Sequence, residues 1–125
     1  MSLVLQIITA EMLYFLAIAS GIWLSHTGKP LNSWILTLHI MIGLGTVFFT
    51  SLVVWRLLQI ETPTTGILVL AISLAALIIG LITSGILLSF DRGYNNRILR
   101  AHNITTILGI IVSTITIYLL GGTSL

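Results

Sequence analysis

Four apolar runs, each long enough to cross a lipid bilayer, constrain this chain more than any other feature of its sequence. A membrane-spanning helix needs about 20 consecutive, mostly apolar residues. Short polar segments separate the runs, which cover residues 3–25, 33–58, 66–90 and 98–120. Because connections this short join neighbouring helices in opposite directions, the sequence predicts an all-α protein, with one antiparallel bundle of four transmembrane helices formed by residues 1–125.

The composition supports insertion into a membrane and argues against a soluble domain. Apolar residues make up 57% of the 125 residues and charged residues only 6%. The mean hydropathy of +1.16 is far above that of soluble domains. The pI of about 9.5 would suggest a nucleic-acid partner for a soluble protein, but here it rests on five Lys and Arg against three Asp and Glu. We therefore expect contact with the lipid bilayer and none with nucleic acid.

Two further features concern cofactors and the first run. The chain contains no cysteine, which excludes disulfides, thiolate metal sites and covalent attachment of a c-type haem. The first run has no basic segment before it and is longer than the apolar part of a signal peptide. We therefore expect this run to be retained as a helix.

The basic residues are distributed unevenly between the two ends of the predicted bundle. Only Arg56 lies at the end that holds the second connection and both termini. The other four basic residues lie at the end formed by the first and third connections: Lys29, Arg92, Arg97 and Arg100. By the positive-inside rule, the end formed by the first and third connections is cytoplasmic, and both termini are outside.

Two histidines fall inside the second and fourth runs. His39 lies six residues after Ser33, and His102 lies five residues after Arg97. Because both helices begin at the same end of the bundle, the two side chains reach similar depths. Each histidine lies on a stripe of small or polar residues, a face that packs against helices rather than lipid. The stripes consist of His39, Gly43, Thr46 and Thr50, and of His102, Thr105, Gly109, Ser113 and Thr116.

A pair of imidazoles with no thiolate or carboxylate at the same level suits the axial positions of a haem iron. Tetrahedral zinc would need two more ligands. Gly43 and Gly109 would leave room for a flat ring, and the propionates of a haem would need cations such as Lys29, Arg97 and Arg100. The alternatives are histidines that form structural hydrogen bonds, glycines that allow close helix packing, and cations that only set the topology and bind lipid headgroups.

This layout resembles that of the four-helix membrane b-type cytochromes, which hold haem between histidines on two helices. The resemblance covers the whole chain and rests on His39 with Gly43 and on His102 with Gly109. It implies one haem b with His39 and His102 as iron ligands. Many members hold two haems with four histidines, but this chain has no histidine near the predicted outer side.

The resemblance also implies a function in electron transfer. The expected role is that of a subunit in a larger respiratory or photosynthetic redox complex, with other redox subunits as partners and a quinone as a further candidate cofactor. The chain has no phosphate loop or nucleophile motif, so we predict no catalytic residue and no complete enzyme.

The third histidine, His26, is predicted to lie in the first connection, next to Lys29. It could be an exposed loop residue, a hydrogen-bond donor to a haem propionate, or a replacement for His39 as ligand if the second helix starts elsewhere. Between the two halves of the chain we find no repeat beyond a histidine and a following glycine in the second and fourth runs.

Glu11 is the only carboxylate within a predicted helix, and an acidic side chain in hydrocarbon indicates a function. Four short helices with a glutamate in the first also resemble the small multidrug transporters, in which that carboxylate exchanges protons for a cationic drug. The charge bias and the histidine pair argue against this alternative. In a cytochrome, Glu11 could relay a proton, bind a quinone near Tyr14, or be a protonated structural group bonded across helices or paired with Arg56. A haem-free anchor subunit is the third candidate function.

Overall fold

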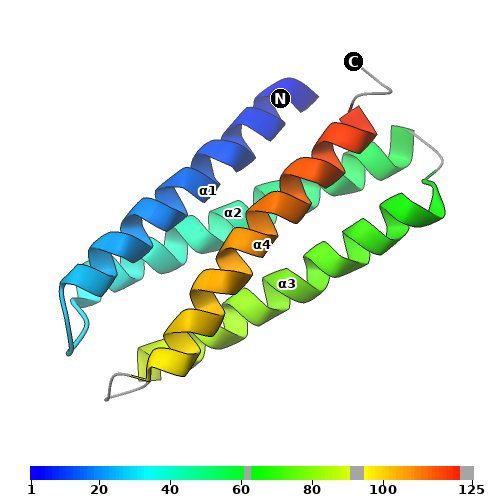
Figure 1. Ribbon diagram of the computed structural model, residues 1–125. Helices are drawn as coiled ribbons and strands as arrows, with labels where there is room; N and C mark the ends of the chain where they lie inside the picture. The colour runs from blue at the N-terminus through cyan, green and yellow to red at the C-terminus, as the bar shows by residue number, and fades with distance from the viewer. Residues whose placement is uncertain (61–62, 91–94, 122–125) are drawn as a thin grey trace.

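The computed structural model describes residues 1–60, 63–90 and 95–121, and these residues form four helices and no strand (Figure 1). The helices are α1 (Leu3–His26), α2 (Ser33–Ile60), α3 (Thr65–Phe90) and α4 (Asn96–Gly121). Each helix is long and apolar enough to cross a membrane. The predicted fold class is therefore confirmed, and the chain is an integral, multi-pass membrane protein.

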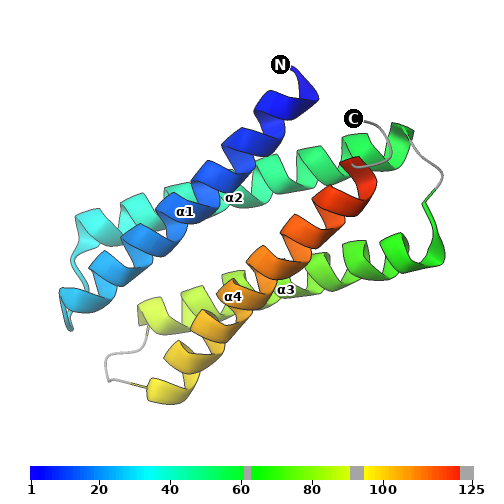
Figure 2. The same ribbon diagram turned by 45° about the horizontal axis from the view of Figure 1, so that its top comes forward.

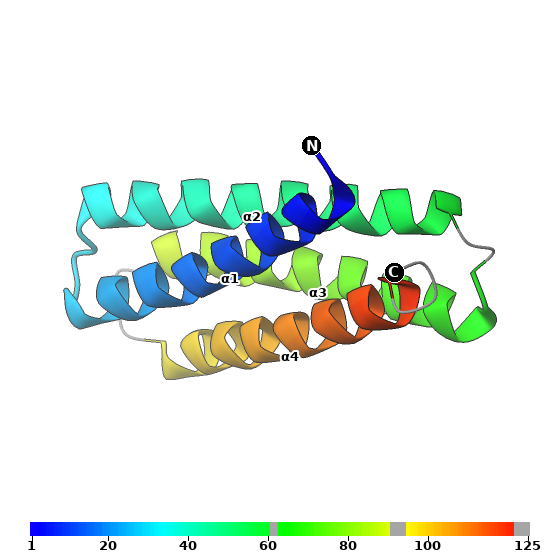
Figure 3. The same ribbon diagram turned by 90° about the horizontal axis from the view of Figure 1, so that it is seen from above.

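The helices form two antiparallel hairpins, with α1 packed on α2 and α3 packed on α4. Figures 2 and 3 show the same two pairs from other directions. The start of α1 and the end of α4 lie at one end of the bundle, and the connection between α1 and α2 lies at the opposite end (Figure 1). The hairpins pack on each other chiefly through α2 and α4. The two helices that carry the histidines are therefore neighbours.

Asparagine side chains cap the N termini of α2 and α4. The backbone N–H groups of Trp34 and Ile35 donate to Asn32 Oδ1, at 3.0 and 3.2 Å. The N–H of Arg97 donates to Asn95 Oδ1, at 3.1 Å. Asparagine is a preferred cap because its side chain satisfies N–H groups that have no partner inside the helix. Since each histidine lies seven residues after its cap, both helices present a histidine at the same depth.

The closely packed core lies in the half of the bundle that holds the start of α1 and the end of α4. The buried residues of α2 and α4 all belong to this half: Thr46, Thr50, Val53, Leu57, Gly109, Ser113, Thr116 and Ile117. In the other half, α2 and α4 bury no side chain within residues 33–45 and 96–108. The interior is therefore packed tightly at one end and loosely at the end that carries the histidines.

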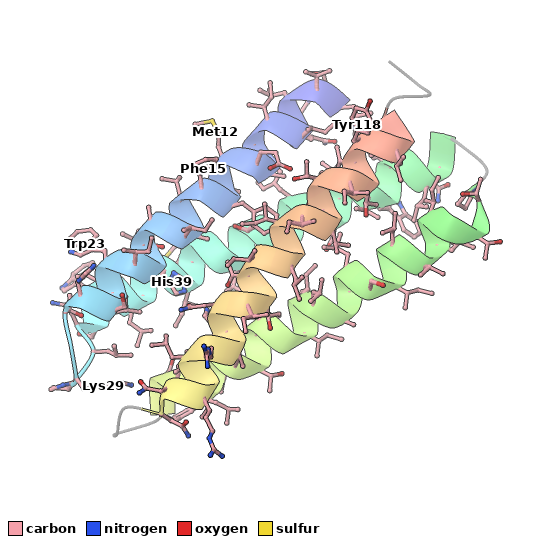
Figure 4. All side chains as sticks on the ribbon, in the orientation of Figure 1. Met12, Phe15, Trp23, Lys29, His39 and Tyr118 are labelled. Carbon is pink, nitrogen blue, oxygen red and sulfur yellow. The ribbon has the colours of Figure 1, made fainter. Side chains whose placement is uncertain are left out.

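Large apolar side chains cover the outside of the bundle. Figure 4 labels three of them on α1, Met12, Phe15 and Trp23, which are 62%, 79% and 57% exposed. Such a surface would be unfavourable in water but matches the hydrocarbon of a bilayer. The exposed faces of the helices are thus suited to contact with the lipid bilayer.

Candidate functional site

His39 of α2 and His102 of α4 meet inside the bundle. Their ring centres are 6.4 Å apart, and the ring planes make an angle of 66°. Both side chains are partly buried. Figure 4 shows His39 in the same half of the bundle as Lys29, whereas Tyr118 lies toward the opposite end. The structure thus brings together the two histidines that the sequence analysis selected.

Each histidine ring is held by a serine from the other helix of its own hairpin. Ser20 Oγ of α1 lies 3.0 Å from His39 Nδ1. Ser84 Oγ of α3 lies 2.8 Å from His102 Nδ1. The sequence analysis did not identify either serine as a site residue. These bonds occupy the Nδ1 atoms and leave Nε2 as the ring nitrogen that can bind another group.

A glycine follows each serine and brings the neighbouring backbone close to the histidine ring. A Cβ atom at Gly21 would lie 3.1 Å from His39 Cε1, which is closer than ordinary van der Waals contact. At Gly85 the corresponding distance to His102 Cε1 would be 3.5 Å. Each ring therefore packs directly on the backbone of the neighbouring helix, most tightly at Gly21.

These contacts belong to a sequence repeat that the two hairpins share, contrary to our expectation from the sequence. The pattern S-G-I-x-L-S occurs at 20–25 and 84–89, and N-x-x-I-L-x-x-H occurs at 32–39 and 95–102. The serine and histidine are 19 residues apart in the first copy and 18 in the second. Because the connections differ by one residue, a single alignment of the halves matches only one of the two patterns. The repeat marks the two segments that hold these serines, although Ser25 and Ser89 recur in it as well.

Gly43 and Gly109, the two glycines predicted to make room for a ligand, have different surroundings. A Cβ atom at Gly43 would have no neighbour within 4 Å among the described residues, whereas one at Gly109 would lie 3.7 Å from Leu81 Cδ1. Gly43 lies one helical turn from His39 and one turn before the buried Thr46. Open space therefore adjoins Gly43, while Gly109 serves the close packing of α4 on α3.

The three predicted cations lie at the end of the bundle that carries the histidines. Lys29 Nζ donates to the carbonyl oxygen of Leu88, at 2.8 Å, and so joins the first connection to the last turns of α3. Arg97 and Arg100, in the first two turns of α4, have exposed side chains. The ammonium group of Lys29 thus lies at this end of the bundle, next to the last turns of α3.

His26 does not join the histidine pair. It is the last residue of α1, and its side chain is exposed. The described part of the chain contains no group of three or more His, Asp or Glu side chains that could hold a metal ion. His39 and His102 are thus the two histidines that can act together.

Glu11 lies in the other half of the bundle, where a buried polar layer lies close to it. Tyr14, three residues later, is only 5% exposed, and its hydroxyl lies beside Thr50 and Ser113. The hydroxyls of Thr50 and Ser113 are buried, and the Tyr14 hydroxyl is the side-chain group that approaches both of them. Arg56, a predicted partner of Glu11, donates instead to the carbonyl oxygen of Met1, at 3.2 Å.

Comparison with known proteins does not assign the chain to a family. No protein-family model matches it, and neither the curated proteins nor the solved structures give a significant match.

Proposed function

We propose that the protein is a membrane b-type cytochrome that holds one haem between His39 and His102 and carries single electrons. The separation of the two rings is the observation that carries this proposal. A metal–imidazole bond is about 2 Å long and the nitrogen lies about 1 Å from its ring centre, so rings on opposite sides of one ion have centres about 6 Å apart. The observed distance is 6.4 Å.

The packing around the histidines supports a flat, largely apolar ligand. In this half of the bundle α2 and α4 bury no side chain within residues 33–45 and 96–108, and Gly43 borders open space. The serine bonds hold both Nδ1 atoms, so Nε2 is the nitrogen of each ring that would bind iron. A bound haem would supply an iron that accepts and releases one electron.

An edge contact between two imidazoles is the competing explanation, because aromatic pairs have centroid separations of about 4.5–7 Å. Such a contact requires neither a serine behind each ring nor open space beside Gly43. Both features occur here, and the first occurs twice, at Ser20 and Ser84. The combination favours ligand binding over simple ring packing.

Lys29, Arg97 and Arg100 are suited to bind the propionates. They lie at the same end of the bundle as the histidines, and charge-assisted hydrogen bonds to carboxylates are among the stronger polar contacts in proteins. We propose that this end is cytoplasmic, in keeping with the positive-inside rule.

We propose further that the chain works as a subunit of a larger redox complex. The hydrocarbon core of a bilayer is about 30 Å thick, and a haem at His39 and His102 would lie in one half of it. The other half contains the packed core and offers no second histidine pair, since the sequence has only three histidines, His26, His39 and His102. A partner subunit or a quinone would have to provide the next electron carrier.

An absorption spectrum of the purified protein tests the central proposal. Protein produced in haem-replete cells is expected to show the sharp reduced α and Soret bands of a low-spin, six-coordinate b-type haem, at one haem per chain. A colourless protein that stays colourless after addition of haemin would refute the proposal and favour the transporter or the anchor subunit.

A further inference from the structure

The hydroxyl groups of Ser20 and Ser84, which contact the two histidines, donate their single protons to backbone carbonyl oxygens. Ser20 Oγ also lies 3.0 Å from the carbonyl oxygen of Ala17, one turn back in α1. Ser84 Oγ lies 2.7 Å from the carbonyl oxygen of Gly80 and 3.1 Å from that of Leu81. A carbonyl oxygen can only accept a hydrogen bond. Each hydroxyl therefore donates to its own helix and is left with acceptor capacity toward the histidine.

The direction of the second bond fixes where the histidine carries its proton. Because the hydroxyl oxygen accepts, Nδ1 of His39 and of His102 must be the donor. A neutral imidazole has one N–H, so a proton on Nδ1 leaves Nε2 with a free electron pair. The tautomer of both rings thus follows from serine bonds to the backbone of α1 and α3.

We infer that Ser20 and Ser84 are positioning residues that hold His39 and His102 with Nδ1 protonated, so that each ring offers an unprotonated Nε2 to an electron-pair acceptor. Two such nitrogens cannot hydrogen-bond to each other, since neither carries a proton. Histidines that bind metals commonly donate the other ring N–H to an oxygen, which fixes the tautomer and orientation and raises ligand basicity. The assignment of the tautomer depends only on the hydrogen bonds. The effect of this tautomer on iron binding rests on the proposed haem function.

The same repeat provides control positions. Ser25 and Ser89 follow the two site serines by five residues, and their hydroxyls donate to carbonyl oxygens of their own helices, Ile22 at 2.7 Å and Gly85 at 2.9 Å. They match the site serines in residue type, helix and local bonding, and neither bonds to a histidine among the described residues. A Ser→Ala change there removes the same atom without touching a ring.

Reduction potential and haem affinity distinguish the two kinds of serine. Loss of the Nδ1 hydrogen bond makes the imidazole a weaker electron donor, which disfavours the oxidised iron and raises the potential. We expect Ser20→Ala and Ser84→Ala each to raise the potential and to weaken haem binding by about 10-fold to 100-fold. Ser25→Ala and Ser89→Ala should leave the reduction potential and the haem affinity unchanged. Ser84→Thr keeps a hydroxyl, so its potential and affinity should be close to those of the parent.

Two results would overturn the inference in a chain that binds haem. The first is that Ser20→Ala and Ser84→Ala leave the reduction potential and the haem affinity unchanged. Equal effects in the site and control variants, without rescue by threonine, would be the other, since they would indicate a general packing defect.

If the parent chain binds no haem, the proposed function fails and the tautomer is tested separately. Nitrogen-15 NMR of labelled histidine distinguishes protonated from unprotonated ring nitrogens in the haem-free protein. Protonated Nδ1 in the parent and loss of that preference at His102 in Ser84→Ala, but not in Ser89→Ala, would support the inference. A protonated Nε2 in the parent would overturn it.

Discussion

Gly21 lies against the ring of His39 so closely that any side chain at this position would meet Cε1 of the ring at 3.1 Å. The backbone of α1 thus acts as one wall of the histidine site, and Ser20 on the same turn bonds to the same ring. The equivalent wall in the second hairpin is looser, since the distance from Gly85 to His102 would be 3.5 Å.

This difference predicts unequal effects of adding a methyl group. Gly21→Ala should displace the His39 ring and reduce haem retention several-fold, because the neighbouring backbone cannot move away easily. Gly85→Ala should have a smaller effect, since 3.5 Å is ordinary contact. Haem content per chain, measured from the spectrum and the protein concentration, checks the order. Gly45→Ala is a suitable control, because its Cβ atom would meet only Leu13, at 3.6 Å.

Substitution of either proposed ligand should affect haem content far more than substitution of the third histidine. His39→Ala and His102→Ala would each remove one of the two proposed iron ligands, so haem content should fall to a small fraction of that of the parent. His26→Ala should keep the haem, because this side chain is exposed at the end of α1. Spectra of the three variants at matched protein yield provide the measurement. Loss of haem in His26→Ala alone would mean that the ligand pair is wrongly assigned.

The open space beside Gly43 predicts that a large side chain there competes with the ligand. Gly43→Phe should lower haem affinity, because its ring would extend into the open space that adjoins the backbone there, and the thermal stability of the haem-free chain shows whether the bundle tolerates the change. Leu44→Phe is the matched control, since Leu44 is the next residue and is 58% exposed. Haemin titration and thermal unfolding measure the two quantities. An equal loss of affinity in both variants would argue against a ligand next to Gly43.

Glu11 separates electron transfer from drug export. A cytochrome subunit should give a sensitive host no resistance to cationic dyes, and Glu11→Gln should leave growth unchanged. A proton-coupled exporter would behave differently, because a neutral amide can bind neither a proton nor a cation with the affinity of a carboxylate. Growth in a dye gradient makes the comparison. Resistance that disappears with this one substitution would make transport the better assignment.

A redox complex should be visible after gentle solubilisation. Native electrophoresis with haem staining is expected to show the chain in a species much larger than 13.6 kDa, together with another redox subunit. The same gel after treatment with a harsh detergent should show the free chain. Haem that migrates only with the free chain under gentle conditions, with no redox subunit recovered alongside it, would contradict the proposed role as a subunit.

The helices could be predicted well from the sequence, and their ends lie within two residues of the predicted positions. Hydropathy is a strong signal because a bilayer requires long, continuous apolar segments. The depths of His39 and His102 followed from counting residues along two helices that start at the same end. The positions of the helices and the depths of the histidines depend on local sequence and on the thickness of the bilayer. They could therefore be predicted without knowledge of tertiary contacts.

The partners of the histidines could not be predicted in the same way. A serine within a helix usually bonds to its own backbone, so nothing in the sequence paired Ser20 with His39 or Ser84 with His102. The contrast between Gly43 and Gly109 also depends on which side chains of neighbouring helices approach them. Only the packing of α1 on α2, and of α3 on α4, distinguishes these positions.

The duplicated hairpin places an equivalent serine and histidine on each side of the bundle interior, Ser20 with His39 and Ser84 with His102. A ligand held between the two rings would meet a histidine bonded to a serine from either side. The symmetry is broken away from the histidines, because Tyr14 of α1 has Ile78 at the equivalent place in α3, and Glu11 has Ala75. The two copies therefore match at the histidines and differ in the packed half of the bundle, so a ligand between the rings would have similar surroundings on its two sides, whereas Tyr14 and Glu11 have no counterpart in the second hairpin.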